Sequence, residues 1–431
     1  MKKSVALFVI LVLSLSMLFS LSSSGENKKQ FEGTQITIIT TMSGPIKAIE
    51  KNLATFEEAT GIKVNFEIYE FQEAINKINI NAAAGGKDVD VICYRPIQET
   101  ISWSKNGYFK SLNDYIAADN DTFDYEDFFP SARQVTTVDG NIVGIPYLVE
   151  GEIVWINTEL FEKYNVEIPT TFDELLDASK KLHHPEDNVY GIALRGEGNG
   201  AVTQFSGFLY GFGGNFFDEN MNASMNTPEA LAALEFYAEL TKYGPEGMAA
   251  TGNTEAINWF NAGLTAMRID AYAQTFNHTD PDRSTVTDKL GYVMLPMGPV
   301  GKYTPYNIVA WAWGISSTSE KQDAAWEFVK WATSKEMEVQ GMLEQGWSAR
   351  SSAWADPRVE ESLDPELMAV VKQTGEVGLP YDRPSNANAS EVRAIVGKMI
   401  DLAHSGLRGE ELAAAIEPLN QNIQTILDSE K

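Results

Sequence analysis

Two hydrophobic periods alternate along the first hundred residues. Apolar residues occupy every second position in 34–40 and 62–68, and 89–94 is a short apolar run, so all three are predicted strands. Between them, apolar residues spaced by three and four over 46–56 predict a helix that packs on a sheet. A second helix is expected over 71–84. Two successive strand–helix–strand units predict a parallel sheet with right-handed crossovers.

Loops at the carboxyl ends of such strands form the natural ligand crevice, and here these loops are 41–43 and 94–96. Later segments show further strands and helices. The predicted strands are 142–147, 153–156, 266–269, 290–295 and 309–315, and the predicted helices are 171–182, 227–240 and most of 359–426. Neither a low-complexity linker nor an internal repeat divides the chain. We therefore expect two globular units joined by several short crossings.

The amino-terminal segment has the pattern of a secretory leader. Lys2 and Lys3 precede an apolar run over 5–21, and three serines follow at 22–24. A positive region, an apolar region and a small-residue cleavage zone predict a signal peptide over 1–24 that is removed after export. An uncleaved membrane anchor is the alternative. The mature chain is expected to work in a periplasm-like space.

Charge and cysteine content narrow the class of partner. The net charge of −27 repels phosphate backbones and anionic headgroups, so we expect no nucleic acid and no direct lipid binding. The single cysteine, Cys93, excludes an intramolecular disulfide and a thiolate metal cluster. Since no cysteine follows the leader, the protein is not expected to be lipid-anchored.

Enzyme signatures are largely missing, and we predict no catalytic residue, no metal and no cofactor. The chain lacks a Gly-x-Ser-x-Gly elbow, a His-Glu-x-x-His helix and a phosphate-binding loop. His183 and His184 are neighbours, which point apart on a helix. The aspartates over 119–127 do not fit a calcium loop, because Phe123 and Asp124 occupy positions that need a ligand and a glycine. A glycosidase-like pair of carboxylates stays open, because 60 acidic residues supply pairs by chance.

Several remaining residues suit a ligand rich in hydroxyl groups. Such a ligand needs flat aromatic rings beside carboxylates, amides and arginine forks. Trp311 and Trp313 lie two apart on a predicted strand and are expected to share a face. Asp270 ends another strand. The glycine-rich turn after 194 and the turn region after 346 add further candidates, which are Arg195, Glu197, Asn199, Trp347 and Arg350.

The order of these segments resembles the extracellular solute-binding proteins of bacterial carbohydrate ABC importers (family 1 type). The segments that carry the resemblance are 56–64, 88–91, 144–157, 169–175, 262–267 and 324–331. Segment 169–175 is similar to the family's P-x-T-W-D-E-L, with Phe172 in place of Trp. Segment 144–157 is similar to its first inter-lobe crossing, with Ile156 in place of a common Tyr. Segments 194–196, 267–271 and 310–313 look most like the sugar- and polyol-binding subgroup.

The resemblance implies an α/β, two-lobed periplasmic-binding-protein fold of type II, with mainly parallel sheets flanked by helices and three inter-lobe crossings. It places 33–149 and 309–346 in lobe one, and 150–308 and 347–431 in lobe two. It also implies a monomer that traps a carbohydrate or polyol by hinge closure and delivers it to membrane permease subunits. The expected ligand contacts, from both lobes and the crossings, are Met42, Tyr94, Arg95, Glu150, Arg195, Glu197, Asp270, Trp311, Trp313, Trp347, Arg350 and Tyr381, with Arg383 as a weaker candidate.

Two other function classes stay open. A secreted carbohydrate-active enzyme would need two carboxylates about 5–10 Å apart on opposite sides of one sugar ring. A binder of peptides or metals is the third reading, and the lack of clustered histidines argues against the metal version. The bound solute and its chain length are not encoded in any motif of the sequence.

Overall fold

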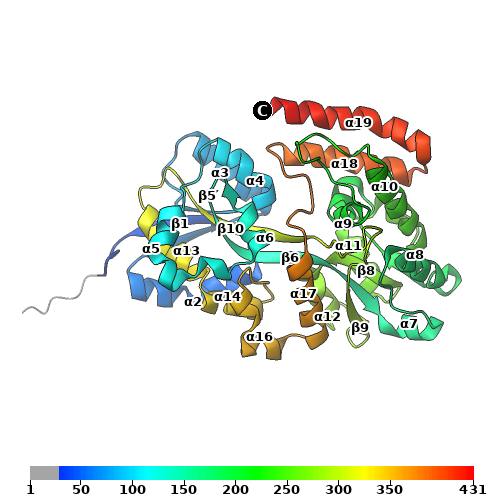
Figure 1. Ribbon diagram of the computed structural model, residues 1–431. Coiled ribbons are helices and arrows are strands. Elements are labelled where there is room, and N and C mark those ends of the chain that lie inside the picture. Colours follow the sequence, from blue (N-terminus) through cyan, green and yellow to red (C-terminus); the bar gives the residue numbers. More distant parts are fainter. Residues whose placement is uncertain (1–28) are drawn as a thin grey trace, which may run out of the picture.

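The computed structural model describes residues 29–431, which form two lobes side by side (Figure 1). The leader predicted over 1–24 lies outside the described residues. Each lobe has its own hydrophobic core, one built around β1 (Gln35–Thr40) and one around β8 (Thr265–Ala271). The chain is therefore a two-lobed α/β protein.

The first lobe begins with the predicted alternation of strands and helices. In chain order these are β1, α2 (Gly44–Thr60), β2 (Lys63–Ile68), α3 (Phe71–Ala83) and β3 (Val91–Tyr94). Strands β2 and β3 flank β1, and both pair with it in parallel. Helix α2 ends at Gly61, whose φ of 81° lies in the left-handed region that favours glycine.

Two long strands continue the sheet from one lobe into the other. They are β6 (Ile145–Asn157) and β10 (Asn307–Ile315), which pair antiparallel. The far half of β6 pairs antiparallel with β8 and β9 (Leu290–Met294), and β7 (Tyr190–Ala193) pairs parallel with β8. The order is β2-β1-β3-β10-β6-β8-β7, with β9 also on β6. Parallel pairs thus lie toward both outer edges, and antiparallel pairs form the crossing.

One difference from the predicted strands lies at this crossing. The sequence predicts separate strands over 142–147 and 153–156, whereas β6 is one continuous strand of 13 residues. Its middle stays extended because Gly151 and Glu150 pair with Asn307 and Ile308 of β10. The crossing is therefore a two-stranded ladder.

The second lobe packs helices around β7 and β8. Helix α8 (Phe172–Lys181) begins at the predicted capping box, in which Thr171 and Glu174 cap each other. Helix α9 (Gly198–Gly211) is buried along most of its length, beneath α10 (Pro228–Leu240) and α18 (Ala389–His404). Helix α19 (Gly409–Ser429) covers α18. The last part of the chain thus returns to lobe two.

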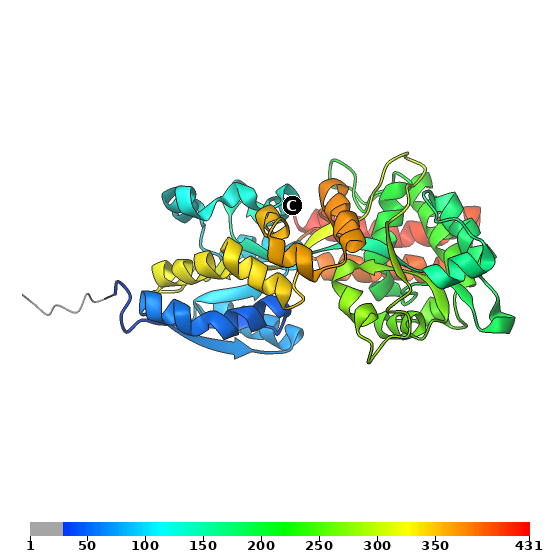
Figure 2. The ribbon, with the colours of Figure 1, turned by 90° about the horizontal axis from the view of Figure 1, so that it is seen from below.

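A third connection runs from the first lobe back to the second. Helices α13 (Gln322–Ala332) and α14 (Lys335–Leu343) cover the first lobe, and α15 (Ser351–Trp354), α16 (Pro357–Ser362) and α17 (Pro365–Val377) follow. Figure 2 shows the orange helices lying across the junction between the lobes. Segment 378–388 then passes the crossing strands, where the amide of Asn307 donates to the carbonyl of Leu379 (2.7 Å).

The shorter elements complete both lobes. They are α4 (Pro96–Lys105), α5 (Asn113–Phe123), α6 (Pro130–Val135), β4 (Thr137–Val138), β5 (Asn141–Ile142), α7 (Thr158–Tyr164), α11 (Asn253–Asn261) and α12 (Thr275–Thr279). Within residues 29–431, no helix combines the length and the apolar character that crossing a membrane requires.

Candidate functional site

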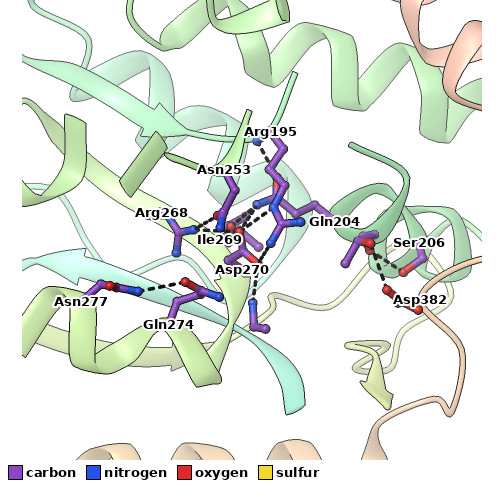
Figure 3. Close-up of polar contacts among 12 residues, drawn as sticks. Arg195, Gln204, Ser206, Asn253, Arg268, Ile269, Asp270, Gln274, Asn277 and Asp382 are labelled. Atoms are coloured by element: carbon purple, nitrogen blue, oxygen red, sulfur yellow. Dashed lines mark hydrogen bonds and ion pairs between the residues drawn. The ribbon is translucent and has the colours of Figure 1, made fainter. Parts of the chain in front are cut away.

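An arginine–carboxylate fork lies at the end of the second lobe's parallel strand pair. Arg195 follows β7, and Asp270 lies near the end of β8, so both reach the same edge of the sheet. Arg195 donates from Nε to Oδ2 of Asp270 (2.8 Å) and from Nη2 to Oδ1 (2.6 Å). Figure 3 shows the two side chains meeting. Such a bidentate pair fixes both groups in orientation as well as charge.

Further donors hold Asp270 from the remaining directions. Arg268, which is fully buried, donates from Nη2 to Oδ2 (2.8 Å), and Gln204 of α9 donates to the same oxygen (3.0 Å). The amide of Ala271 donates to Oδ1 (2.8 Å). Burial raises the pKa of Asp270, but Arg195 and Arg268 outweigh it, so the pKa lies below its ordinary value. The carboxylate is therefore charged and fixed before any solute arrives.

A second charged pair reaches the same region from segment 378–388. Asp382 is fully buried, accepts from Nε of Arg383 (2.6 Å) and from the Thr203 hydroxyl of α9 (2.9 Å). Figure 3 shows Asp382 beside α9. Arg393 of α18 donates to the Thr203 oxygen (2.9 Å). The returning segment is thus tied to lobe two by charge-assisted hydrogen bonds.

The first lobe and the crossing strand complete the charged set. The Arg95 guanidinium lies 6.0 Å from the Trp311 ring, and burial lowers its pKa to about 10, against the opposing effect of Glu99. Glu150 lies on β6. Burial and the nearby Asp382 and Asp270 raise the pKa of Glu150 to about 7.

These groups influence one another across the lobe boundary. Asp382 and Glu150 raise the pKa of Arg95, and Arg383 lowers it, which places groups from both lobes together. We call this set the interlobe polar cluster. Its members are Arg95, Glu150, Arg195, Asp270, Asp382 and Arg383.

A small apolar cluster adjoins these charges. Ile97 of α4, Ala271 of β8 and Ile308 of β10 pack with Tyr306, and Tyr381 lies against them half-buried. The Tyr381 hydroxyl accepts from Gln134 of the first lobe (3.4 Å). The lobes therefore meet through apolar contacts beside charged hydrogen-bonding groups, which is the combination that a polyhydroxylated solute requires.

Two of the predicted tryptophans lie in hydrophobic cores. Trp313 is fully buried and stacks on Tyr147 with ring centroids 4.8 Å apart, whereas Trp311 is half-buried beside Arg95. The pairing of β10 with β6 shifts register on both sides of Trp311, so the two tryptophans do not share one environment. Trp347 is also buried and stacks on Trp354 (5.6 Å).

The other predicted contacts also include residues that are buried in a core and residues that are not. Tyr94 is fully buried against Phe109 in the first core. Arg350 is buried and donates to the carbonyls of Phe123 (2.7 Å) and Thr333 (2.6 Å). The remaining two predicted contacts, Met42 and Glu197, are exposed. The structure thus brings Arg95, Glu150, Arg195, Asp270, Trp311 and Tyr381 together.

Several neighbours of these residues were not predicted. They are Glu152, Thr203, Gln204, Arg268, Tyr306, Asp382 and Arg393. A signal existed for Arg268, because it lies two residues before Asp270 on one strand. The opposite charges of Asp382 and Arg383 also stand side by side in the sequence. Gln204 and Tyr306 carry no local signal, since only the packing of α9 and β10 brings them near Asp270.

A separate hollow lies beside α17. It has a volume of about 600 Å³, and its lining includes Phe129, Tyr272, Trp354 and Met368. None of the six residues of the interlobe polar cluster lines it. It is therefore distinct from the charged region.

Comparison with known proteins identifies the family to which this architecture belongs. Residues 40–339 match the family of bacterial extracellular solute-binding proteins. The chain belongs to this family. A mannitol-binding protein of Pseudomonas aeruginosa is 28% identical over 306 residues, covering 70% of this chain and 69% of the relative. An erythritol/L-threitol-binding protein of Mycolicibacterium smegmatis is 27% identical, covering 73% and 69%.

Solved structures of solute-binding proteins share the fold. One from Agrobacterium vitis with bound D-mannitol is 27% identical, with a TM-score of 0.72 over 92% of this chain and 98% of its own. One from Agrobacterium radiobacter in complex with ribitol has a TM-score of 0.78 at 23% identity, covering 92% and 100%. Members of this family bind solutes for ABC transport, so the chain is a binding protein and the enzyme reading is not supported.

Proposed function

We propose that this protein captures a sugar alcohol or a sugar between its lobes and passes it unaltered to the permease subunits of an ABC importer. The observation that carries the proposal is the interlobe polar cluster. In it, the Arg195–Asp270 fork of lobe two lies near Glu150 of the crossing and Arg95 of lobe one. The polyols bound by the relatives support the same solute class.

Hydroxyl groups match this arrangement chemically. Each hydroxyl donates to a carboxyl oxygen such as those of Glu150 and accepts from a guanidinium such as Arg195, which Asp270 holds in place. A hydrogen bond to a charged group contributes about 1.5–3 kcal/mol, so a few give micromolar binding, which needs about 8 kcal/mol. Because the arms of lobe two are already fixed, little side-chain ordering opposes binding.

The burial of the aromatic residues favours an open-chain polyol over a sugar ring. A pyranose offers a flat C–H face that packs on an aromatic ring. Trp313 and Trp347 are enclosed in the cores, which leaves Trp311 and Tyr381 as the half-buried rings among the predicted contacts. A flexible alditol needs hydrogen-bonding groups along its length more than a flat platform.

Thermal unfolding against a panel of solutes tests the proposal. Erythritol, ribitol, D-mannitol, D-glucose and maltose would each be added to the purified protein. A solute at 100 times its dissociation constant stabilises the folded state by about 2.7 kcal/mol. We expect this shift with at least one alditol and its loss in Arg195→Ala. Absence of a shift with every solute, or product release from aryl glycosides, would overturn the proposal.

We also propose that residues 1–24 direct export and are then removed. In this proposal the mature protein is a periplasmic monomer without a lipid anchor or a nucleic-acid partner. The net charge of −27 argues against a nucleic-acid partner, and the burial of the single cysteine in β3 argues against a lipid anchor. Mass spectrometry of the exported protein tests the cleavage, since an intact leader would contradict it.

A further inference from the structure

Glu152 and Tyr306 are cross-strand neighbours next to the interlobe polar cluster. Asn307 pairs with Gly151 and Ile308 with Glu150, and the amide of Glu152 donates to the carbonyl of Tyr306 (2.9 Å). Tyr306 therefore lies opposite Glu152. Residues in such positions point to one face of the sheet, with Cβ atoms about 4.5–5.5 Å apart. Both side chains are fully buried.

Three polar atoms of this pair have no hydrogen-bond partner within residues 29–431. They are Oε1 and Oε2 of Glu152 and the hydroxyl of Tyr306. Buried polar atoms in folded proteins are nearly always bonded, because leaving them unpaired is costly. The adjoining Asp270 shows the contrast, since its carboxylate receives four side-chain donor contacts and one amide. Among the described residues, the three atoms thus lack the hydrogen bonds that Asp270 has.

The surroundings restrict what that partner can be. A Cβ atom added to Gly207 of α9 would lie 2.1 Å from Oε2 of Glu152 and 2.6 Å from a methyl carbon of Leu295, so this glycine leaves room for the carboxyl group. On the other side, β8 places Ala271 opposite Glu152. The Glu152 carboxyl group is thus flanked by two small residues, Gly207 of α9 and Ala271 of β8.

The electrostatics favour an uncharged group. Burial raises the pKa of Glu152 well above its ordinary value, and the nearby Asp270 raises it further. Burial and Asp270 also raise the pKa of Tyr306. Both shifts favour the protonated, uncharged form, in which each side chain can donate one hydrogen bond and accept others.

We infer that Glu152 and Tyr306 form the inner end of the solute site, where they bind a terminal hydroxymethyl group of an open-chain polyol. The inference rests on the proposed function and adds the part of the solute that is recognised there. A hydroxymethyl group is slender and neutral, donates and accepts at one oxygen, and places its CH2 against Ala271. The charged arms of the cluster then bind the remaining hydroxyls.

Paired ligands and variants test this inference. Titration calorimetry would compare D-mannitol with 1,6-dideoxy-D-mannitol, which lacks both terminal hydroxyls. We expect Tyr306→Phe to bind mannitol about tenfold more weakly than wild type. When mannitol is replaced by the dideoxy compound, the affinity of this variant should fall by a smaller factor than the affinity of wild type. Glu152→Leu should weaken mannitol similarly, and Glu152→Gln, which keeps a neutral donor and acceptor, should restore most of the affinity.

Two controls separate recognition from folding. Tyr125→Phe removes a buried hydroxyl of the first lobe that also lacks a partner among the described residues, and it should leave the ratio of the two affinities unchanged. The melting temperature of unliganded Tyr306→Phe should not fall, because the lost hydroxyl makes no hydrogen bond within residues 29–431. A residue that only supports the fold would lower it.

The outcomes distinguish this inference from the proposed function. The inference alone is overturned if Tyr306→Phe and Glu152→Leu bind mannitol with wild-type affinity. It is also overturned if the ratio of the mannitol and dideoxymannitol affinities is the same in the variants as in wild type. In either case, the pair would bind no more than a buried water molecule. Tighter binding of D-glucose than of any alditol would overturn it as well. If wild type binds neither alditols nor sugars, the proposed function fails and the inference fails with it.

Discussion

The two lobes contribute to the interlobe region in different ways. On the second lobe, Asp270 is enclosed by Arg195, Arg268 and Gln204, and its geometry is set by folding. On the first lobe, Tyr94 and Trp313 are part of the core, and Arg95 lies beside the half-buried Trp311 within the influence of Glu150 and Asp382. This difference supports the proposal that lobe two holds a preformed recognition surface and that lobe one covers it. In such a division, closure follows only if the solute binds the closed form better.

The largest effect is expected for Asp270→Ala. It leaves Arg195 and the fully buried Arg268 without their shared carboxylate, so the free energy of unfolding should fall by about 3–5 kcal/mol. Solute binding should be lost. Denaturant unfolding and titration calorimetry measure the two effects.

The matched control comes from the first lobe. Asp90 is also fully buried and pairs with Lys321 (2.8 Å). Asp90→Ala should destabilise the protein and leave the affinity of the folded fraction near wild type. If Asp90→Ala and Asp270→Ala lost affinity equally, the proposed difference in solute recognition between the two lobes would be contradicted.

Trp313→Ala should reduce stability without reducing affinity. The side chain is fully buried, stacks on Tyr147 and contacts Phe328 edge-on, and its truncation should cost about 3–5 kcal/mol. Calorimetry at a temperature where the variant stays folded should give a dissociation constant within about twofold of wild type. A tenfold loss would place Trp313 in the site, as the sequence pattern predicted.

Arg195→Lys should have a smaller effect on affinity. Lysine keeps the charge but cannot make the two parallel hydrogen bonds to Asp270. We expect solute binding to weaken by about tenfold, with the fold intact, as measured by calorimetry. An unchanged affinity would mean that the position of the guanidinium does not matter for the solute.

The smallest expected effect is a change in the pH dependence of stability. Burial, Asp382 and Asp270 raise the pKa of Glu150 from 4.5 to about 7. Between these values the unfolded chain ionises at this residue while the folded protein stays protonated, so stability falls as pH rises through this window. Below the unfolded pKa the two states are protonated alike and the effect vanishes.

Glu150→Gln should therefore flatten part of the decline in melting temperature between about pH 5 and about pH 7. Part of the decline should remain, because burial also raises the pKa of Glu99 to about 7. An identical decline in the variant and wild type would show that Glu150 is ionised throughout this range.

The strands and helices were largely predictable because their patterns are local. The spacing of Ile46, Ile49 and Phe56 and the alternation around Ile36 needed no distant partner to predict α2 and β1. The continuity of β6 was missed, since it depends on β10, which lies 150 residues further along the chain.

The charged members of the interlobe polar cluster were easier to predict from the sequence than the surroundings of the aromatic residues. Asp270 follows a predicted strand and Arg195 lies in a glycine-rich turn, and both are visible in the sequence. The strand before Arg195 was not predicted, and it is the parallel pairing of β7 with β8 that brings the two residues together. The different surroundings of Trp311 and Trp313 could not be predicted, because the register shift in β10 cannot be seen in the sequence. Tyr306 was missed because its neighbours come from β6, α4 and β8 at once.

A crystal structure of the protein with a bound alditol tests the central claim most directly. The account predicts electron density for the solute between Arg195, Asp270 and Glu150, with one end at Tyr306. Density in the hollow beside α17, against Tyr272 and Trp354, with the interlobe polar cluster free of solute, would contradict it.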